Sequence, residues 1–251
     1  MIQSKDNEKL KLVRRLRERK HREREGLFAT EGEDLLTAGL AAGAEPRFVL
    51  VAAGARSTLV NLSVTKVDRG GGGLDYDEVE PGLLASVSSL GSGTRAIAVW
   101  PRPEPRPARA PCVYLDGVGD PGNVGAIVRT AHALLDATVA LGPDCADPFG
   151  PKATRASMGS VFARPPAAVS GVEETPAPRV ALVAHGGAGL DLLAGAATLC
   201  LGAERDGLRA EVVAACAGSA TIPLQEGAES LNVAAAAAVA CARMGEERKG
   251  A

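Results

Sequence analysis

Alternating prolines in the middle of the chain set the strongest limit on how it can fold. Residues 101–111 read PRPEPRPARAP. Proline fixes its own φ angle and lacks the N–H group that helices and inner strands need, so we expect this segment to be extended and semi-rigid. It divides the 251 residues into an N-terminal unit (1–100), a linker (101–111) and a C-terminal unit (112–251), and both units have ordinary domain sizes.

Positive charge is concentrated at the N-terminus. The net charge is only −2, yet residues 1–26 hold ten Lys or Arg against five Asp or Glu. We expect a charged helix over 5–25 with one narrow apolar stripe. A solvated helix face is the plainer interpretation, but a basic arm on an otherwise acidic chain favours contact with a nucleic acid. The candidate contact residues are Arg14, Arg15, Arg17, Lys20, Arg22 and Arg24.

Short apolar runs alternate with helical stretches in both units. In the N-terminal unit the runs at 27–30, 48–52, 62–67 and 97–100, with a glycine turn at 70–73, predict a small α/β sandwich. In the C-terminal unit we expect strands at 112–115, 137–141, 180–184, 198–201 and 220–223, and helices at 124–135, 151–158, 208–217 and 231–244. This rhythm predicts an α/β fold with a mostly parallel sheet covered by helices on both faces.

The cysteines and histidines give no indication of a metal site. The five cysteines are far apart and never spaced as C-x-x-C, so we expect reduced, packed side chains and no bound metal. The chain also shows no N-terminal apolar segment and no run of 18 apolar residues. We therefore expect a soluble cytoplasmic protein without a membrane segment.

Two apolar runs near the C-terminus each lead into a loop broken by glycine or proline. The runs lie at 198–208 and 221–234, and the second loop passes through Ser230 and Asn232 into an alanine-rich helix. Two such loops at adjacent strand ends form a pocket edged with backbone polar groups. A small polar cofactor could bind there.

The loop 117–122 reads GVGDPG and raises the alternative of a dinucleotide site. Pro121 removes an N–H that would meet the pyrophosphate, and no acidic residue ends the next strand, because Asp136 precedes it and Asp144 comes late. The helix after this loop fits another chemistry better. We expect Asn123 at its N-cap and Arg129 on the same helix as a clamp for an anion or phosphate, rather than a surface charge.

Four segments together resemble the SpoU/TrmH family of RNA ribose 2′-O-methyltransferases, in the SPOUT superfamily. They are Asp116 with 120–131, the stretch 152–159, and the loops 201–208 and 222–234. Residues 22–32 are similar to the start of the family's L30e-like RNA-binding domain. The resemblance implies a deep trefoil knot in the C-terminal sheet, S-adenosylmethionine as cofactor, RNA as partner and a homodimer whose active site is completed across the interface.

The resemblance also implies roles for individual residues. The cofactor-binding set would be Leu201, Gly202, Ala203, Glu204, Ile222, Pro223, Leu224, Ser230, Leu231, Asn232 and Ala234, and the catalytic set Arg129, Asn123, Glu204, Ser230 and Asn232. Family accounts make Arg129 the base. Because a guanidinium stays charged in proteins, a clamp on a phosphate that stabilises the developing alkoxide is the alternative. Arg155 would contact RNA, although packing explains Arg155 and Ser157 equally well.

The function implied is methylation of a ribose 2′-hydroxyl in RNA. An N-terminal domain before the catalytic one favours ribosomal RNA, 23S in particular, over transfer RNA. A transfer RNA methyltransferase and a catalytically silent RNA-binding relative remain alternatives. A nicotinamide-dependent dehydrogenase is third.

Overall fold

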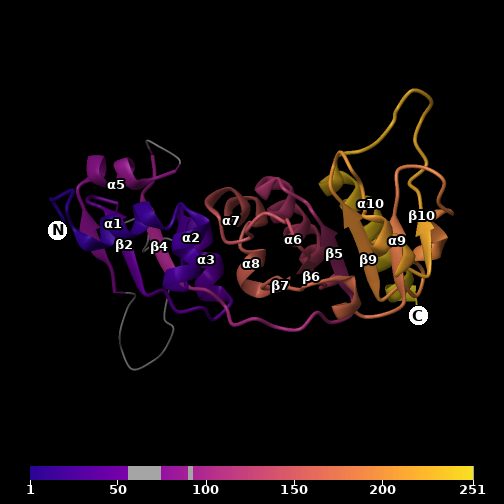
Figure 1. Cartoon of the computed structure of the whole chain (residues 1–251). Coiled ribbons are helices and arrows are strands. Elements are labelled where there is room, and N and C mark those ends of the chain that lie inside the picture. The colour runs from indigo at the N-terminus through magenta and orange to yellow at the C-terminus, as the bar shows by residue number, and fades with distance from the viewer. Residues whose placement is uncertain (56–74, 90–92, 251) are drawn as a thin grey trace. The chain divides into compact units, whose positions relative to one another are not determined.

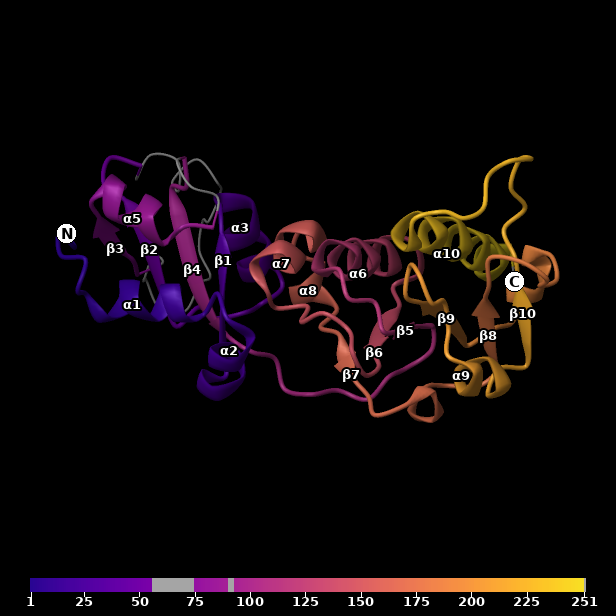
Figure 2. The same ribbon diagram turned by 45° about the horizontal axis from the view of Figure 1, so that its top comes forward.

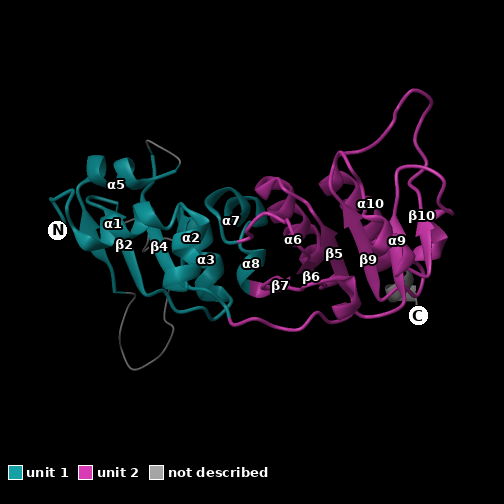
Figure 3. Ribbon diagram, in the orientation of Figure 1, with its two compact units in different colours: residues 1–103, 149–162 teal, residues 104–148, 163–251 magenta. Residues whose placement is uncertain are grey.

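The computed structural model describes residues 1–55, 75–89 and 93–250. Two compact units are formed, residues 1–103 with 149–162 and residues 104–148 with 163–251 (Figure 3). The strand expected at 62–67 and the turn expected at 70–73 lie outside the described residues. Segment 149–162 follows the proline linker in the chain but belongs to the first unit. A division of the chain at the linker does not predict that the chain goes back to this unit.

A four-stranded sheet with the order β1-β4-β2-β3 forms the centre of the first unit (Figure 1). Strands β1 and β2 are antiparallel to β4, and β3 is parallel to β2. The strands are β1 (Leu27–Glu31), β2 (Phe48–Ala52), β3 (Asp77–Val79) and β4 (Ala96–Pro101). Because alternate side chains of a strand face opposite sides, Ile97 and Val99 pack into one apolar cluster while Trp100 packs into the other.

Helices cover both faces of this sheet. One cluster joins the strands to α1 and α5 through Leu10 and Leu84, and the other joins them to α3 and α8 through Leu36 and Phe162. The helices of the unit are α1 (Glu8–Arg15), α2 (Arg19–Glu25), α3 (Glu33–Ala41), α5 (Pro81–Val87), α7 (Pro151–Ser157) and α8 (Ser160–Ala163). This arrangement is the α/β sandwich expected from the alternating apolar runs.

The basic N-terminal segment forms two helices, so the prediction of a single helix over 5–25 was wrong. Helix α1 ends at Arg15 and α2 begins at Arg19, with Glu18 between them in extended conformation. The Arg22 guanidinium donates from Nη1 to the carbonyls of Leu16 and Arg17, 2.8 Å away in each case. These carbonyls at the break would otherwise lack the partners that a continuous helix supplies.

The second unit is built on a six-stranded parallel sheet with the order β10-β8-β9-β5-β6-β7. Every pair is parallel, which confirms the predicted sheet. The strands are β5 (Cys112–Asp116), β6 (Thr138–Leu141), β7 (Ala167–Ala168), β8 (Arg179–Leu182), β9 (Thr198–Gly202) and β10 (Gly218–Ala220). The strand expected at 220–223 was placed too late, because β10 ends at Ala220 and the chain then leaves the sheet. The two-residue β7 is too short for an apolar pattern to indicate.

Both faces of the parallel sheet are buried. Helices α6 (Pro121–Leu135) and α10 (Val233–Gly250) lie together on one face, and α9 (Ala210–Ala214) lies on the other (Figure 2). Two short 3-10 helices, η1 (Val172–Glu174) and η2 (Leu190–Leu193), lie in the connections. Consecutive residues of β5 point to opposite faces of the sheet. Leu115 packs against the side of α6, and Tyr114 packs on the side of α9.

Candidate functional site

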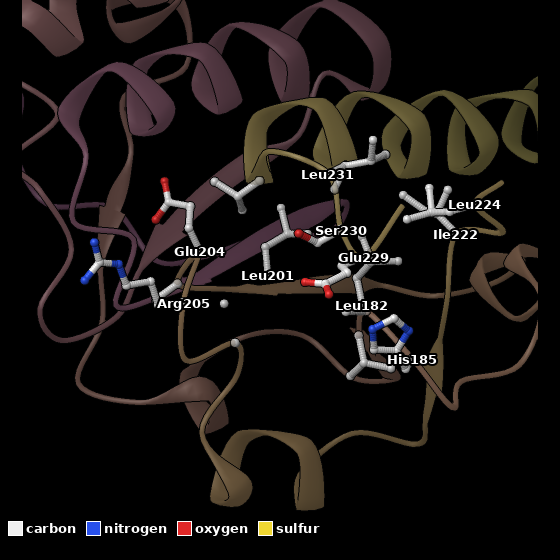
Figure 4. A pocket seen from close by; sticks show the side chains of 17 residues that line it. Leu182, His185, Leu201, Glu204, Arg205, Ile222, Leu224, Glu229, Ser230 and Leu231 are labelled. Carbon is white, nitrogen blue, oxygen red and sulfur yellow. The ribbon is translucent and has the colours of Figure 1, made fainter. Parts of the chain in front are cut away.

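A cavity of about 380 Å³ opens at the carboxyl ends of β8 and β9, and we call it the strand-end cavity (Figure 4). The residues expected to bind a cofactor that line it are Leu201, Gly202, Ala203, Glu204, Ile222, Leu224, Ser230 and Leu231. Parallel strands end at the same edge of their sheet, which brings these distant loops together. The volume lies in the range of small-molecule sites.

The walls of the strand-end cavity differ in part from the expected set. Pro223, Asn232 and Ala234 do not line it. The segment 182–185, at the end of β8, does line it, together with Arg205 and Glu229. In Figure 4, Glu204 and Arg205 lie together on the left, apart from His185 and Glu229. Finding the 182–185 wall from the sequence requires knowing that β8 is the neighbour of β9, and the order of strands is not visible in apolar periodicity.

The loop after β9 closes on itself tightly. Ala203 and Gly207 exchange backbone hydrogen bonds of 3.1 and 3.0 Å, and Gly207 has a φ of +67° that favours glycine. A Cβ atom on Gly202 would lie 2.1 Å from the carbonyl carbon of Gly207. The glycine at 202 is therefore required for the loop to fold back and form one wall of the cavity.

Three of the expected catalytic side chains form one hydrogen-bonded chain. The Asn232 Nδ2 donates to Asn123 Oδ1 over 3.2 Å, and Asn123 Nδ2 donates to Glu204 Oε1. Asn232 Oδ1 also accepts from the backbone N–H groups of Ala234 and Ala235, at 3.0 and 3.4 Å, as the cap of α10. We call Asn232, Asn123 and Glu204 the amide relay. It ties the start of α6, the β9 loop and the start of α10 together.

Asn123 does not cap α6, and that prediction was wrong. The cap is Asp120, whose carboxylate accepts from the Asn123 backbone N–H at 3.0 Å. Pro121 occupies the first helical position, where a missing N–H costs nothing because it would be unpaired anyway. Because Asp120 accepts the hydrogen bond of the Asn123 backbone N–H, the side-chain amide of Asn123 remains available for the amide relay.

A partly buried ion pair between Asp116 and Arg209 holds the far end of the β9 loop, and the sequence did not indicate it. The Asp116 side chain is 1% exposed and accepts from the Arg209 backbone N–H at 2.9 Å and from Arg209 Nε at 2.8 Å. Hydrogen bonding to this carboxylate raises the pKa of Arg209 above its ordinary value. Asp116 stands in the family-like motif, but only the pairing of β5 with β9 brings it to Arg209, so no local pattern could have identified the pair.

Arg129 lies on α6 with an exposed side chain and does not line the strand-end cavity. Among the described residues it has no ion-pair partner. The guanidinium is therefore available to an anionic ligand from outside this chain. Ser230 is also exposed and lies in the cavity wall (Figure 4).

Most of the candidate RNA-contacting side chains are accessible. Arg15, Arg17, Lys20 and Arg24 are exposed, and Arg14 is half-buried. Arg22 was wrongly included, because it is 4% exposed and serves the carbonyls at the break between α1 and α2. Arg155 is exposed on α7 and donates to Ser89 Oγ at 3.1 Å. Ser157 is buried and donates to the Thr154 carbonyl, a packing role.

The cysteines are free thiols, and most of them are buried. Burial raises the pKa of Cys112 and of Cys241 to about 12, which disfavours the reactive thiolate form. Within the described part of the chain, no group of three or more His, Cys, Asp or Glu side chains could hold a metal ion. The same residues include no helix with both the length and the apolar character needed to cross a bilayer.

The glycine loop 117–122 takes no part in the strand-end cavity. Gly117 turns the chain after β5 with a φ of +67°, and Asp120 then begins α6. A dinucleotide site would need this loop to contact the ligand. The strand-end cavity lies instead at the ends of β8 and β9, which argues against a dinucleotide site of this type in that cavity.

Comparisons with known proteins agree with this geometry. Residues 110–242 match the model of the SpoU rRNA methylase family, and residues 7–98 match an MRM3-like substrate binding domain. The 23S rRNA (guanosine(2553)-2′-O)-methyltransferase RlmP of Bacillus subtilis is 30% identical over 95% of this chain and 96% of its own length.

Two solved structures are similar over nearly their whole lengths. The SpoU methyltransferase AviRb from Streptomyces viridochromogenes, in complex with the cofactor AdoMet, has a TM-score of 0.82 and 26% identity, covering 98% of this chain and 100% of its own. A putative RNA methyltransferase of the TrmH family from Porphyromonas gingivalis has a TM-score of 0.80 and 30% identity, with coverages of 98% and 99%.

Proposed function

Because the chain belongs to the SpoU rRNA methylase family, we propose that it transfers a methyl group from S-adenosylmethionine to a ribose 2′-hydroxyl of 23S ribosomal RNA. The family predicted from the sequence motifs is thereby confirmed, and with it the class of S-adenosylmethionine-dependent RNA methyltransferases. The choice of 23S RNA rests on RlmP, whose name gives that substrate and 96% of whose length this chain matches. The observation that carries the proposal is the amide relay beside the strand-end cavity.

The strand-end cavity suits S-adenosylmethionine in size and chemistry. Leu201, Ile222 and Leu224 offer apolar contacts to a flat base, while the carboxylates of Glu204 and Glu229 suit a ligand that carries positive charge. The close approach of Gly202 to Gly207 leaves no room for a side chain, so the ligand would meet backbone on that wall. When bound, S-adenosylmethionine supplies an electrophilic methyl group on a sulfonium.

The chain's own residues would then position and activate the ribose. The amide relay would fix the loops, so that Ser230 can hydrogen-bond near the reactive hydroxyl. Arg129 would clamp a neighbouring phosphate and stabilise the developing alkoxide, with the proton passing to phosphate or water. A literal base role for Arg129 is less favourable because a guanidinium does not lose its proton in proteins.

We also propose the wider organisation implied by the family resemblance. The N-terminal domain, 1–100, would bind RNA through its exposed basic side chains, and 101–111 would link it to a catalytic domain, 112–251, with a trefoil knot. A homodimer would place the exposed Arg129 against the partner's site. A cytoplasmic location fits an RNA substrate. A transfer RNA substrate and a silent RNA-binding relative are the alternatives.

The test is methyl transfer to 23S RNA transcribed without modifications, with ribose methylation mapped by resistance to alkaline hydrolysis. We expect one methylated ribose with the wild-type chain. No product despite S-adenosylmethionine binding would favour transfer RNA, tested next with unmodified transcripts. Failure to bind S-adenosylmethionine in calorimetry would favour the silent relative.

Substitution of Arg129 separates its two possible roles. We expect Arg129→Ala to lower the rate by roughly a hundredfold, the size found when one donor to a developing oxyanion is removed. Arg129→Lys keeps the charge but loses the two-pronged geometry, so it should retain only part of the rate. A lysine variant with nearly full rate would exclude both a special base and a bidentate clamp.

A further inference from the structure

A second cavity, of about 580 Å³, lies in the C-terminal unit at the edge of the sheet opposite the strand-end cavity. Thr138 begins β6, and Ala110 comes shortly before β5, so the residues around the cavity belong to the amino ends of these parallel strands. The side chains that line it include Arg106, Arg109 and Arg164. We call this cavity the arginine cleft.

The arginine cleft holds more positive than negative charge. Arg164 is paired with Asp136, with Nη2 2.6 Å from both carboxylate oxygens. Arg106 and Arg109 are exposed, and neither has a carboxylate partner among the described residues. Of the described residues that line the cleft, Asp136 is the only acidic one, against three arginines. Two guanidinium groups are therefore left to a ligand.

The stiffness of the proline linker orients the guanidinium groups of Arg106 and Arg109 before a ligand binds. Pro103, Pro105 and Pro107 favour the polyproline II helix, which has three residues per turn. Residues 106 and 109 are three apart, so this conformation places both side chains on the same side of the segment. A stiff segment loses little conformational entropy on binding, which favours affinity.

We propose that the arginine cleft binds the phosphodiester backbone of the RNA substrate, at nucleotides away from the methylated ribose. This inference rests on the proposed function. Parallel strands separate the cleft from the strand-end cavity, so one nucleotide cannot reach both. Arginine matches phosphate oxygens with paired hydrogen bonds, and the cleft is rimmed by proline and alanine rather than by the aromatic side chains that would stack on bases.

The test measures equilibrium binding of fluorescent 23S RNA transcript to the full chain over a range of salt concentrations. We expect Arg106→Ala and Arg109→Ala each to weaken RNA binding by about threefold to tenfold and to lower the slope of log Kd against log salt by about one. Arg243→Ala is the matched control, since Arg243 lies on α10 and pairs with Asp191. It should change neither quantity, and S-adenosylmethionine affinity should be unaltered in all three variants.

Asp136→Asn provides a change in the opposite direction. Asp136 has a φ of +52°, which asparagine tolerates well, so the backbone should be retained. Removing the carboxylate frees Arg164, and RNA binding should tighten about twofold or more with a steeper salt slope.

The outcomes separate the inference from the proposed function. Suppose that the wild-type chain binds RNA and that the Arg106→Ala and Arg109→Ala variants bind it with the same affinity and salt slope as Arg243→Ala. That result would overturn the inference but leave the proposed function standing. Absence of RNA binding by the wild-type chain would overturn both. If the two variants weaken RNA binding by the same factor at every salt concentration, the cleft binds another protein or supports the fold and does not bind phosphates. This result would also overturn the inference.

Discussion

Asn232 donates from its Nδ2 to the Oδ1 of Asn123 over 3.2 Å, although 109 residues separate them in the chain. This bond fixes the orientation of both amides. The oxygen of Asn232 is turned to the N–H groups at the start of α10, and the nitrogen of Asn123 is turned to Glu204. Each of the two side chains thus uses its donor and its acceptor at once, which an amide can do and an ionised carboxylate cannot.

Asn232→Asp should separate catalysis from stability. Aspartate keeps an oxygen for the α10 cap, where a negative charge is favourable, but it cannot donate to Asn123 and it brings a second carboxylate toward Glu204. We expect the methyl transfer rate to fall about tenfold or more, since a misplaced group near the reacting atoms is costly. The melting temperature should stay the same or rise slightly.

The control for this prediction is Asn7→Asp. Asn7 caps α1 in the same way, accepting from the Lys9 N–H at 2.9 Å, and it is far from the site in the chain. It should leave the rate unchanged. Equal activity of Asn232→Asp and the wild type would show that the amide relay has no role in the reaction.

Gly202→Ala should damage the strand-end cavity, because the new methyl group would overlap the backbone of Gly207 at 2.1 Å. Crowding of this kind costs about 1–3 kcal/mol of unfolding free energy. We expect S-adenosylmethionine affinity, measured by calorimetry, to fall at least about tenfold with the wall displaced. Gly189→Ala is the matched control, since a Cβ at Gly189 meets no atom within 4 Å. Unchanged affinity in Gly202→Ala would mean that the loop is not a ligand wall.

The sequence predicts those parts of the site that depend on residues close together in the chain, and it misses those that depend on the order of strands in the sheet. The loops at 201–208 and 222–234 were predicted to meet because parallel strands end at one edge, and they do line one cavity. The wall after β8 was not predicted, because strand order is a property of the whole sheet. The Asp116–Arg209 pair was missed for the same reason, since its partners are 93 residues apart.

The N-terminal unit shows a second limit of local patterns. The basic run suggested one uniform helix face, yet Leu16 is buried where α1 ends and Arg22 turns inward to the break. A charged side chain with its stem buried has the same sequence signature as one in solvent. Only the packing of the segment on the sheet distinguishes Arg22 from Arg15.

Arg22→Lys should therefore lower stability and not RNA affinity. Lysine keeps the charge but lacks the planar guanidinium that serves two carbonyls, so we expect a loss of roughly 1–2 kcal/mol of unfolding free energy. Trp100, the single tryptophan and fully buried in the same unit, reports this unfolding by fluorescence in urea. Arg15→Lys should be neutral, and Arg15→Ala should weaken RNA binding without changing the urea midpoint. A stable Arg22→Lys variant would contradict a structural role.

Stability should fall at alkaline pH, with a contribution from Cys241. Burial raises the pKa of the Cys241 thiol from 9.0 to about 12, so the folded chain holds this proton more tightly than the unfolded chain does. The resulting stability is complete below pH 9 and is lost as the pH rises toward 12, at about 1.4 kcal/mol per pH unit. Urea unfolding with reductant, followed by circular dichroism, should show Cys241→Ala less stable than the wild type at pH 8 because of the cavity it leaves. By pH 10 that difference should shrink by about 1 kcal/mol, since the variant has no thiol to ionise on unfolding. A difference that stays constant between these pH values would show that the thiol ionises equally in both states.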